Sequence, residues 1–167
     1  MQIKYITTQQ QAQEALQDLE SCKKVCLDYE TTGLDARIAR PRLLQLCDTK
    51  EEQADRIVYV FDLFKLTDLQ ELKTYIETRE MLVGHNLNFD LQFNLKLGID
   101  FKNKLFDTYV AEKCLRAGFK EKRISPQAKK PYFADVSCSL KAVVERRLEE
   151  EIDKEQRLTD WSQDKLT

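Results

Sequence analysis

The stretch that decides the fold reads Val25-Cys26-Leu27-Asp28-Tyr29-Glu30-Thr31-Thr32-Gly33-Leu34. Its apolar beginning predicts a buried strand. Strand side chains repeat every second residue, so Asp28 and Glu30 project from the same face. Two neighbouring carboxylates repel each other and are costly to remove from water, which gives a fold little structural reason to pair them. A divalent cation such as Mg²⁺ or Mn²⁺ reverses that cost, so the pair predicts a metal site.

A second stretch supplies another acid. It reads Val83-Gly84-His85-Asn86-Leu87-Asn88-Phe89-Asp90, a short apolar strand followed by the start of a helix. Asp90 could serve only as a first-turn acid that complements the helix dipole. With Asp28 and Glu30, however, it makes three carboxylates at strand ends, and this pattern indicates a metal site.

The two stretches resemble the first two motifs of the DEDD 3′→5′ exonucleases, in the branch of ribonuclease D and the proofreading domains of A-family polymerases. The matching segments are Asp-x-Glu-Thr-Thr-Gly-Leu at 28–34 and His-Asn-x-x-Phe-Asp at 85–90. Later landmarks of the branch follow in family order: Asp107-Thr108, Ser139-Leu140-Lys141, Asp153-Lys154 and Thr159-Asp160-Trp161-Ser162. The family's third motif, Tyr-x-x-x-Asp or His-x-x-x-Asp, is expected soon after Thr167, where this sequence stops.

The resemblance implies a site for two Mg²⁺ or Mn²⁺ ions. Asp28 would bridge both ions, Glu30 would ligate the ion that activates water, and Asp90 would hold the second ion. One ligand, the aspartate of the third motif, is missing from these 167 residues together with the histidine or tyrosine that precedes it. His85 does not match that position and is expected to pack at a strand end. Asp160 and Asp164 do not match it either.

The resemblance also implies three substrate contacts, namely Thr31, Leu34 and Asn86. Leu34 would wedge beside the terminal base, or else pack in an ordinary loop. Asn86 would contact the 3′ nucleotide, or else only cap a helix. Asp107 is better explained as the cap of the helix that follows it.

The hydrophobic pattern predicts five strands, at residues 3–6, 24–29, 42–48, 57–61 and 81–84. Short connections between the middle three favour antiparallel hairpins over helical crossovers. Helices are expected to follow, with a truncated one at the C-terminus. The predicted fold is therefore α/β, a single domain over residues 1–167. The family resemblance implies a ribonuclease H-like mixed sheet flanked by helices on both faces.

Five helices are predicted from their caps and apolar faces. The first is capped by Thr7 or Thr8 and the second opens with the capping-box pattern Thr67-Asp68-Leu69-Gln70, while the third runs over 87–97 and stops at Gly98. The inward residues are expected to be Ala12, Ala15, Leu16 and Leu19; Leu69, Leu72 and Ile76; Val110, Cys114 and Leu115 before Gly118; and Leu140, Val143, Val144 and Leu148 after Ser139. Trp161 and Leu158 are expected to anchor the tail.

Charge and cysteines bound the cellular setting. A net charge of −2 gives no global attraction to nucleic acid, so contacts must come from local basic patches and from metals. The basic segment at 119–137 is predicted to be a mobile loop that is either simply solvated or binds phosphates. Five scattered cysteines, with neither a Cys-x-x-Cys pair nor a signal peptide, indicate a reducing, cytoplasmic compartment. No stretch has the length of a membrane span.

The expected function is a metal-dependent 3′→5′ exonuclease that acts on the 3′ end of single-stranded nucleic acid and releases 5′-mononucleotides. The 167-residue form is expected to be weak or inactive. One alternative is a catalytically inert nucleic-acid-binding remnant. Another is a proofreading module of a larger polymerase, which the initial Met1 disfavours. The sequence does not choose between DNA and RNA, because no readable motif reports on the 2′-hydroxyl.

Overall fold

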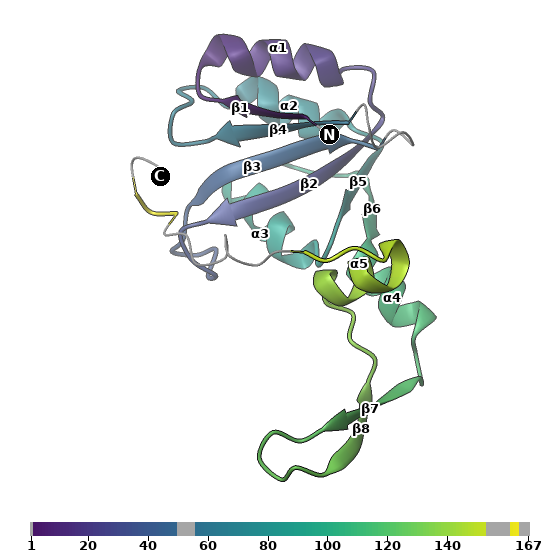
Figure 1. Ribbon diagram of the computed structural model, residues 1–167. Coiled ribbons are helices and arrows are strands. Elements are labelled where there is room, and N and C mark those ends of the chain that lie inside the picture. The colour runs from purple at the N-terminus through teal and green to yellow at the C-terminus, as the bar shows by residue number, and fades with distance from the viewer. Residues whose placement is uncertain (1, 50–55, 153–160, 164–167) are drawn as a thin grey trace. The chain divides into compact units, whose positions relative to one another are not determined.

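The computed structural model describes residues 2–49, 56–152 and 161–163 (Figure 1). Its main sheet contains β1 (Gln2–Ile6), β2 (Lys24–Thr31), β3 (Pro41–Asp48), β4 (Ile57–Asp62), β5 (Met81–Gly84) and β6 (Lys104–Asp107). The helices are α1 (Gln9–Leu19), α2 (Gln70–Thr78), α3 (Asn88–Lys96), α4 (Thr108–Leu115) and α5 (Leu140–Leu148). A separate hairpin consists of β7 (Lys120–Ile124) and β8 (Pro131–Asp135).

The chain divides into two compact units, one of residues 1–107 with 158–167 and one of residues 108–157. The first unit holds the six-stranded sheet and α1 to α3, and the second holds α4, α5 and the hairpin. None of the helices that the structure describes has the length and apolar character of a membrane span.

The six strands form one mixed sheet in the order β1-β4-β3-β2-β5-β6. β2 pairs antiparallel with β3, and β3 with β4, which confirms the predicted hairpins. On its other side β2 pairs parallel with β5, and β5 with β6. The sixth strand, β6, was not predicted from the sequence. It is only four residues long, and its two apolar residues are adjacent, so they show no alternation of apolar and polar side chains.

One face of the sheet carries the core. Val25, Leu27 and Tyr29 of β2 are buried there, and helices α1 to α3 supply the covering apolar side chains. In Figure 1, α1 and α2 lie together near β1 and β4, and these two helices contact each other. The opposite face of β2 carries Asp28, which is exposed, and Glu30, which is half-buried.

The start of α1 is as predicted. Thr8 caps it with a full capping box, and Ala12, Ala15, Leu16 and Leu19 are its buried residues. The capping box predicted for α2 is wrong. Leu69 occupies the cap position without a side-chain bond, and Asp68 Oδ1 instead accepts from the Gln70 backbone N–H at 2.8 Å.

The second unit corrects three predictions. Val110, Cys114 and Leu115 of α4 are exposed, as are Leu140 and Leu148 of α5, although all five were predicted to be buried. The buried residue of α4 is Glu112, which binds arginines of α5, so the two helices meet through charges. Finally, the predicted loop at 119–137 contains the β7–β8 hairpin.

Candidate active site

The candidate site lies at the end of β2, beyond the point where β2 pairs with β5. β5 is only four residues long, and it pairs with β2 at residues 24–26 alone. The rest of β2 therefore has no parallel partner on that side. A buried backbone N–H without an acceptor is costly, so this stretch needs another group to accept its hydrogen bonds.

Asp90 supplies that acceptor. It lies in the first turn of α3, is only 2% exposed, and its Oδ1 accepts from the Tyr29 backbone N–H at 3.0 Å. This hydrogen bond holds the start of α3 against the end of β2. It also places the Asp90 carboxylate beside the strand that carries Asp28 and Glu30. The structure thus brings together elements 61 residues apart in the chain.

The electrostatics of Asp90 reflect this position. Burial, and after it the negative charge of Asp28, together raise the pKa of its carboxyl to about 7. Asp107 adds a smaller contribution of the same sign. Asp28 and Asp90, predicted from two separate motifs, therefore lie close enough to repel each other. A cation between them would remove that repulsion.

The side chain of Tyr29 fixes the same contact from the core side. Its hydroxyl donates to Asn94 Oδ1 at 2.7 Å, and Asn94, completely buried, lies one helical turn after Asp90. Phe93 of α3 also packs near the Tyr29 ring, with 6.2 Å between ring centroids. The residue between the two acids of β2 thus ties the strand to α3 through both its backbone and its ring.

The turn that leads into α3 is held by Asp107 at the end of β6. Its Oδ1 accepts from the Asn86 N–H at 2.9 Å, and its Oδ2 accepts from the Leu87 N–H at 3.0 Å. The sequence predicts that Asp107 caps α4, the helix that follows it. These two hydrogen bonds give its carboxylate a further role, at the turn that precedes α3.

Two residues make this turn possible. Asn86 has φ 64°, a left-handed conformation that asparagine adopts more readily than most residues. Gly84 is needed because of crowding, since a Cβ there would lie 2.4 Å from Leu87 Cδ2 and 3.0 Å from the Leu27 carbonyl oxygen. The backbone conformation of Asn86 therefore shapes this turn. Contact between Asn86 and the 3′ nucleotide stays a prediction.

The other predicted substrate residues lie in and after the end of β2. Thr31 donates its hydroxyl to the Gly33 carbonyl oxygen at 2.7 Å, which shapes the turn. Leu34 is 88% exposed, so ordinary loop packing does not account for this apolar side chain. His85 is half-buried at the end of β5, as expected from the sequence.

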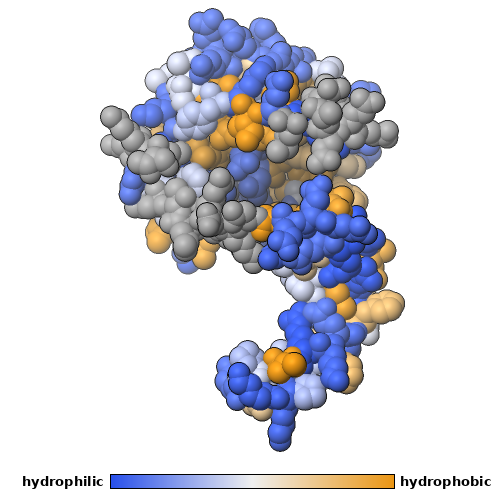
Figure 2. All heavy atoms as spheres, in the orientation of Figure 1, coloured by the Kyte–Doolittle hydropathy of each residue, from blue (hydrophilic) through white to orange (hydrophobic). Residues whose placement is uncertain are grey.

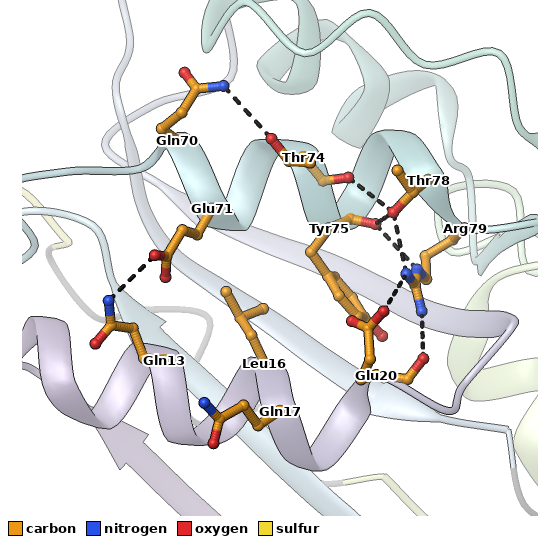
Figure 3. Close-up of a pocket in the computed structure, with 10 residues that line it drawn as sticks. All are labelled: Gln13, Leu16, Gln17, Glu20, Gln70, Glu71, Thr74, Tyr75, Thr78 and Arg79. Atoms are coloured by element: carbon orange, nitrogen blue, oxygen red, sulfur yellow. Dashed lines mark hydrogen bonds and ion pairs between the residues drawn. The ribbon is translucent and has the colours of Figure 1, made fainter.

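A groove of the first unit lies away from these residues. It measures about 750 Å³ between α1 and α2 and is drawn in Figure 3. Polar side chains along it bond to each other, with Gln13 donating to Glu71 at 3.1 Å and Arg79 donating to the Glu20 carbonyl oxygen at 3.0 Å. None of the three predicted metal ligands lines it. The groove is a surface feature of helix packing.

Within the described ranges, no three His, Cys, Asp or Glu side chains form a group that could hold a metal ion. The chemistry of the predicted ligands nevertheless suits a hard cation. Mg²⁺ is commonly bound by one or two carboxylates, with water and substrate phosphate completing its shell. Asp28 and Asp90 meet that requirement, and Glu30 projects from the same strand face as Asp28. The landmarks Asp153, Lys154, Thr159 and Asp160 lie outside the described residues, as do Leu158 and Asp164.

Comparison with known proteins identifies the family. A family model described as 3′-5′ exonuclease matches residues 3–167, which is nearly the whole chain. The chain belongs to this 3′-5′ exonuclease family. The exonuclease domain is 36% identical over 111 residues to DNA polymerase I of Aquifex aeolicus (strain VF5), covering 66% of this chain and 17% of that protein. The DEDD resemblance read from the motifs is therefore confirmed.

Solved structures show the same fold. Escherichia coli RNase D aligns with a TM-score of 0.74 and 20% identity, over 100% of this chain and 39% of that one. The Aedes aegypti Nibbler EXO domain aligns with a TM-score of 0.74 and 14% identity, over 99% of this chain and 77% of that one. The exonuclease chain thus spans less than two fifths of RNase D and about a sixth of DNA polymerase I. The predicted ribonuclease H-like fold class is confirmed.

Sequence reasoning missed the supporting residues of the site. Tyr29 lies between the two acids of β2 and was treated only as part of the strand. Asn94 lies four residues after Asp90, a spacing that puts both on one helix face, and this signal could have pointed to it. The clamp by Asp107 could not be found in this way, because it depends on the unpredicted strand β6.

Proposed function

We propose that this exonuclease domain removes 5′-mononucleotides stepwise from the 3′ end of single-stranded nucleic acid, using two Mg²⁺ or Mn²⁺ ions. Asp28 and Glu30 would hold the ion that activates water, and Asp28 and Asp90 the second. The observation that carries this proposal is the buried Asp90 carboxyl beside β2, whose pKa burial and then the negative charge of Asp28 raise to about 7. A bound cation offsets the repulsion that this arrangement otherwise carries.

The chain's own residues perform the positioning. Tyr29 donates its backbone N–H to one oxygen of Asp90 and so orients that carboxylate. Asp107 holds the turn that places Asn86, the expected contact of the 3′ nucleotide. Leu34, exposed beyond β2, is the expected wedge beside the terminal base. When bound, the divalent ions would supply an activated water and would stabilise the leaving oxygen.

Structural relatives support the ligand classes. Among them are Brucella melitensis NrnC with bound Mg²⁺, the same protein bound to pGG, and Trypanosoma brucei RNase D in complex with RNA U12. These proteins are 18%, 18% and 14% identical to this chain, so they support a shared site only through the shared fold. The choice between DNA and RNA is left to experiment.

Activity on labelled 20-nucleotide strands of dT and of U tests the proposal. A 5′ label should reveal a ladder that shortens from the 3′ end, with Mg²⁺ or Mn²⁺ and not with EDTA. Asp28→Asn should lower the rate at least about 100-fold, because loss of even an outer-shell partner of a metal site costs up to that much. Asp100→Asn, at an exposed acid, is the matched control.

An absence of divalent-dependent shortening in all conditions would contradict the proposal, as would full activity of Asp28→Asn. We expect slow hydrolysis, because residues 1–167 contain no Tyr-x-x-x-Asp or His-x-x-x-Asp segment to supply the fourth carboxylate and a general base. A general base typically contributes about 10²- to 10⁴-fold. Binding of the strand without shortening would support a nucleic-acid binder without activity instead.

A further inference from the structure

The β7–β8 hairpin is a feature that the proposed active site does not use. Its strands pair antiparallel, with Lys120 opposite Asp135, Lys122 opposite Phe133 and Ile124 opposite the first residue of β8. Directly opposed residues of an antiparallel pair project from the same face. Lys122, Ile124 and Phe133 therefore share one face, which we call the Lys122 face.

The Lys122 face is exposed and chemically mixed. Phe133 is 74% exposed and Ile124 is 70% exposed, with Lys122 between them. In Figure 2 the hairpin shows an apolar group in orange surrounded by hydrophilic residues in blue. Two strands alone do not enclose a core, and an isolated two-stranded hairpin is marginally stable at best. Core packing therefore does not explain the exposed Phe133 ring.

The charges of the hairpin are unbalanced. Residues 119–136 contain five basic and two acidic side chains, a net charge of +3 in a chain whose total is −2. Both acids are already used, because Asp135 pairs with Lys120 and Glu121 pairs with Arg123. Lys122, Lys129 and Lys130 have no ion pair with any residue in the described part of the chain. They are all exposed.

The turn between the strands holds two of these lysines in place. The Ser125 N–H donates to the Lys130 carbonyl oxygen at 2.9 Å, and the Lys129 N–H donates to the Ser125 carbonyl oxygen at 2.9 Å. Lys129 has φ 52°, a left-handed conformation that glycine adopts at lower cost. The turn therefore carries a lysine where backbone geometry alone would favour glycine.

We propose that the hairpin binds the backbone of a single-stranded nucleic acid, with Lys122, Lys129 and Lys130 contacting phosphates and Phe133 stacking on a base. This inference rests on the proposed function, since it names a second contact for the same class of substrate. Charge complementarity selects the partner, because a strand of phosphates would meet an exposed ring beside lysines that have no ion pair with any residue the structure describes. This combination is typical of sequence-tolerant single-strand binding.

Binding of fluorescein-labelled dT₂₀ and U₂₀ to the full 167-residue chain, measured by anisotropy in EDTA over a salt series, tests the proposal. The triple variant Lys122→Gln, Lys129→Gly, Lys130→Gln should reduce the slope of log K against log salt by about 2, since each lost contact to a single strand contributes about 0.7. Affinity at low salt should fall about tenfold or more. Glycine suits the backbone at 129, so this variant keeps the hairpin.

Phe133→Ala should weaken binding about fivefold or more at every salt concentration without changing the slope, because stacking is not electrostatic. Phe133→Leu, which keeps an apolar side chain, should lose as much. The matched control neutralises three exposed lysines of the first unit, Lys23→Gln, Lys24→Gln and Lys65→Gln, and should leave the slope within half a unit of the wild type.

An unchanged slope in the hairpin triple variant, or an equal loss in the control, would overturn the inference and leave the hairpin as a candidate contact for a protein. The assay in EDTA separates this result from the proposed function. If the wild type never shortens a strand but the hairpin variants still lose binding, the exonuclease proposal fails and the hairpin inference stands. The reverse pattern removes only the hairpin inference.

Discussion

At the scale of single residues, the candidate site is defined by Asp90, whose carboxylate accepts a hydrogen bond from the backbone of β2. Asp90 accepts a hydrogen bond that a longer β5 would have taken, so its burial follows from the length of a neighbouring strand. Burial raises the pKa of the Asp90 carboxyl to about 7 in the metal-free protein. The folded chain therefore retains a proton on Asp90 at pH values where the unfolded chain has released it.

This linkage gives a signed pH dependence. Because the folded pKa of Asp90 lies above the unfolded value, its contribution to stability is fully present below about pH 4 and is lost as pH rises through about 7. In EDTA, Asp90→Asn should flatten this part of the pH profile and raise the free energy of unfolding at pH 8 relative to the wild type, by about 2 kcal/mol. Urea unfolding at pH 5 and pH 8 measures it.

Asp28→Asn is the companion variant. It removes the neighbouring negative charge but keeps Asp90, so the loss of stability between pH 5 and pH 8 should become smaller without disappearing. Saturating Mn²⁺ should raise the stability of the wild type at pH 8 and should do little for either variant. Identical pH profiles for the wild type and Asp90→Asn would contradict the raised pKa of the buried Asp90 carboxyl.

At the scale of elements, the connection from β5 to α3 sets where Asp90 lies. Gly84 ends β5, Asn86 takes the left-handed conformation, and Asp107 of β6 binds the two following N–H groups. Three elements, β5, β6 and α3, thus fix one short turn. The strand β6 matters to the site through this clamp, although it is an edge strand with little buried surface.

Gly84→Ala tests this turn. The added Cβ would lie 2.4 Å from Leu87 Cδ2 and 3.0 Å from the Leu27 carbonyl oxygen, so the Leu87 side chain must shift. Because Leu87 is buried, we expect the start of α3 to move with it. Overpacking of this kind typically costs about 1 to 3 kcal/mol. The shift should also weaken Mn²⁺ binding, measured by calorimetric titration, because Asp90 moves with α3.

Gly33→Ala is the matched control, since a Cβ there would meet only the Ala39 Cβ at an ordinary 3.5 Å. It should change unfolding free energy by less than about 1 kcal/mol and leave Mn²⁺ affinity unchanged. If Gly84→Ala were as mild as Gly33→Ala, the close packing of this turn would not be a determinant of the site.

At the scale of the whole molecule, the two units are stabilised by different forces. The first unit has an apolar core drawn from α1, α2, α3 and the sheet. In the second, Glu112 is the buried residue of α4, and it binds Arg116, Arg146 and Arg147. The guanidinium of Arg147, with help from Arg116 and Arg146, lowers the pKa of Glu112 to about 2.

The second unit should therefore be sensitive to acid. The folded pKa of Glu112 lies below its unfolded value near 4.5, so its contribution is present above that value and is lost as pH falls toward 2. Hydrogen exchange, expressed as protection factors for peptides of α4 and α5, should show protection falling over this range. Glu112→Gln should lower protection at pH 7 and remove most of the pH dependence.

Glu121→Gln, the same substitution at a partly exposed pair of the same unit, is the control and should leave the protection of α4 and α5 unchanged. Peptides of the first unit should keep their protection in both variants at pH 7. Equal protection of α4 in the wild type and Glu112→Gln would show that the arginine cluster does not stabilise this unit.

Local sequence pattern determined much of this protein. The alternation in β2 placed Asp28 and Glu30 on one face, and short connections predicted the antiparallel hairpins, because side-chain period and loop length are local properties. Thr8 and Gly98 marked helix ends for the same reason. Motif order alone led to the correct family.

Only the tertiary structure decided which groups meet. Asp90 reaches Tyr29 because β5 is short, and Asp107 serves α3 because β6 lies beside β5, and no local pattern encodes either adjacency. The apolar stripes of α4 and α5 correctly predicted that both segments are helices. They did not predict how the two helices contact each other, because Glu112 of α4 forms ion pairs with Arg146 and Arg147 of α5. Periodicity fixes the face of an element, whereas the partner of that face depends on the packing of the other elements.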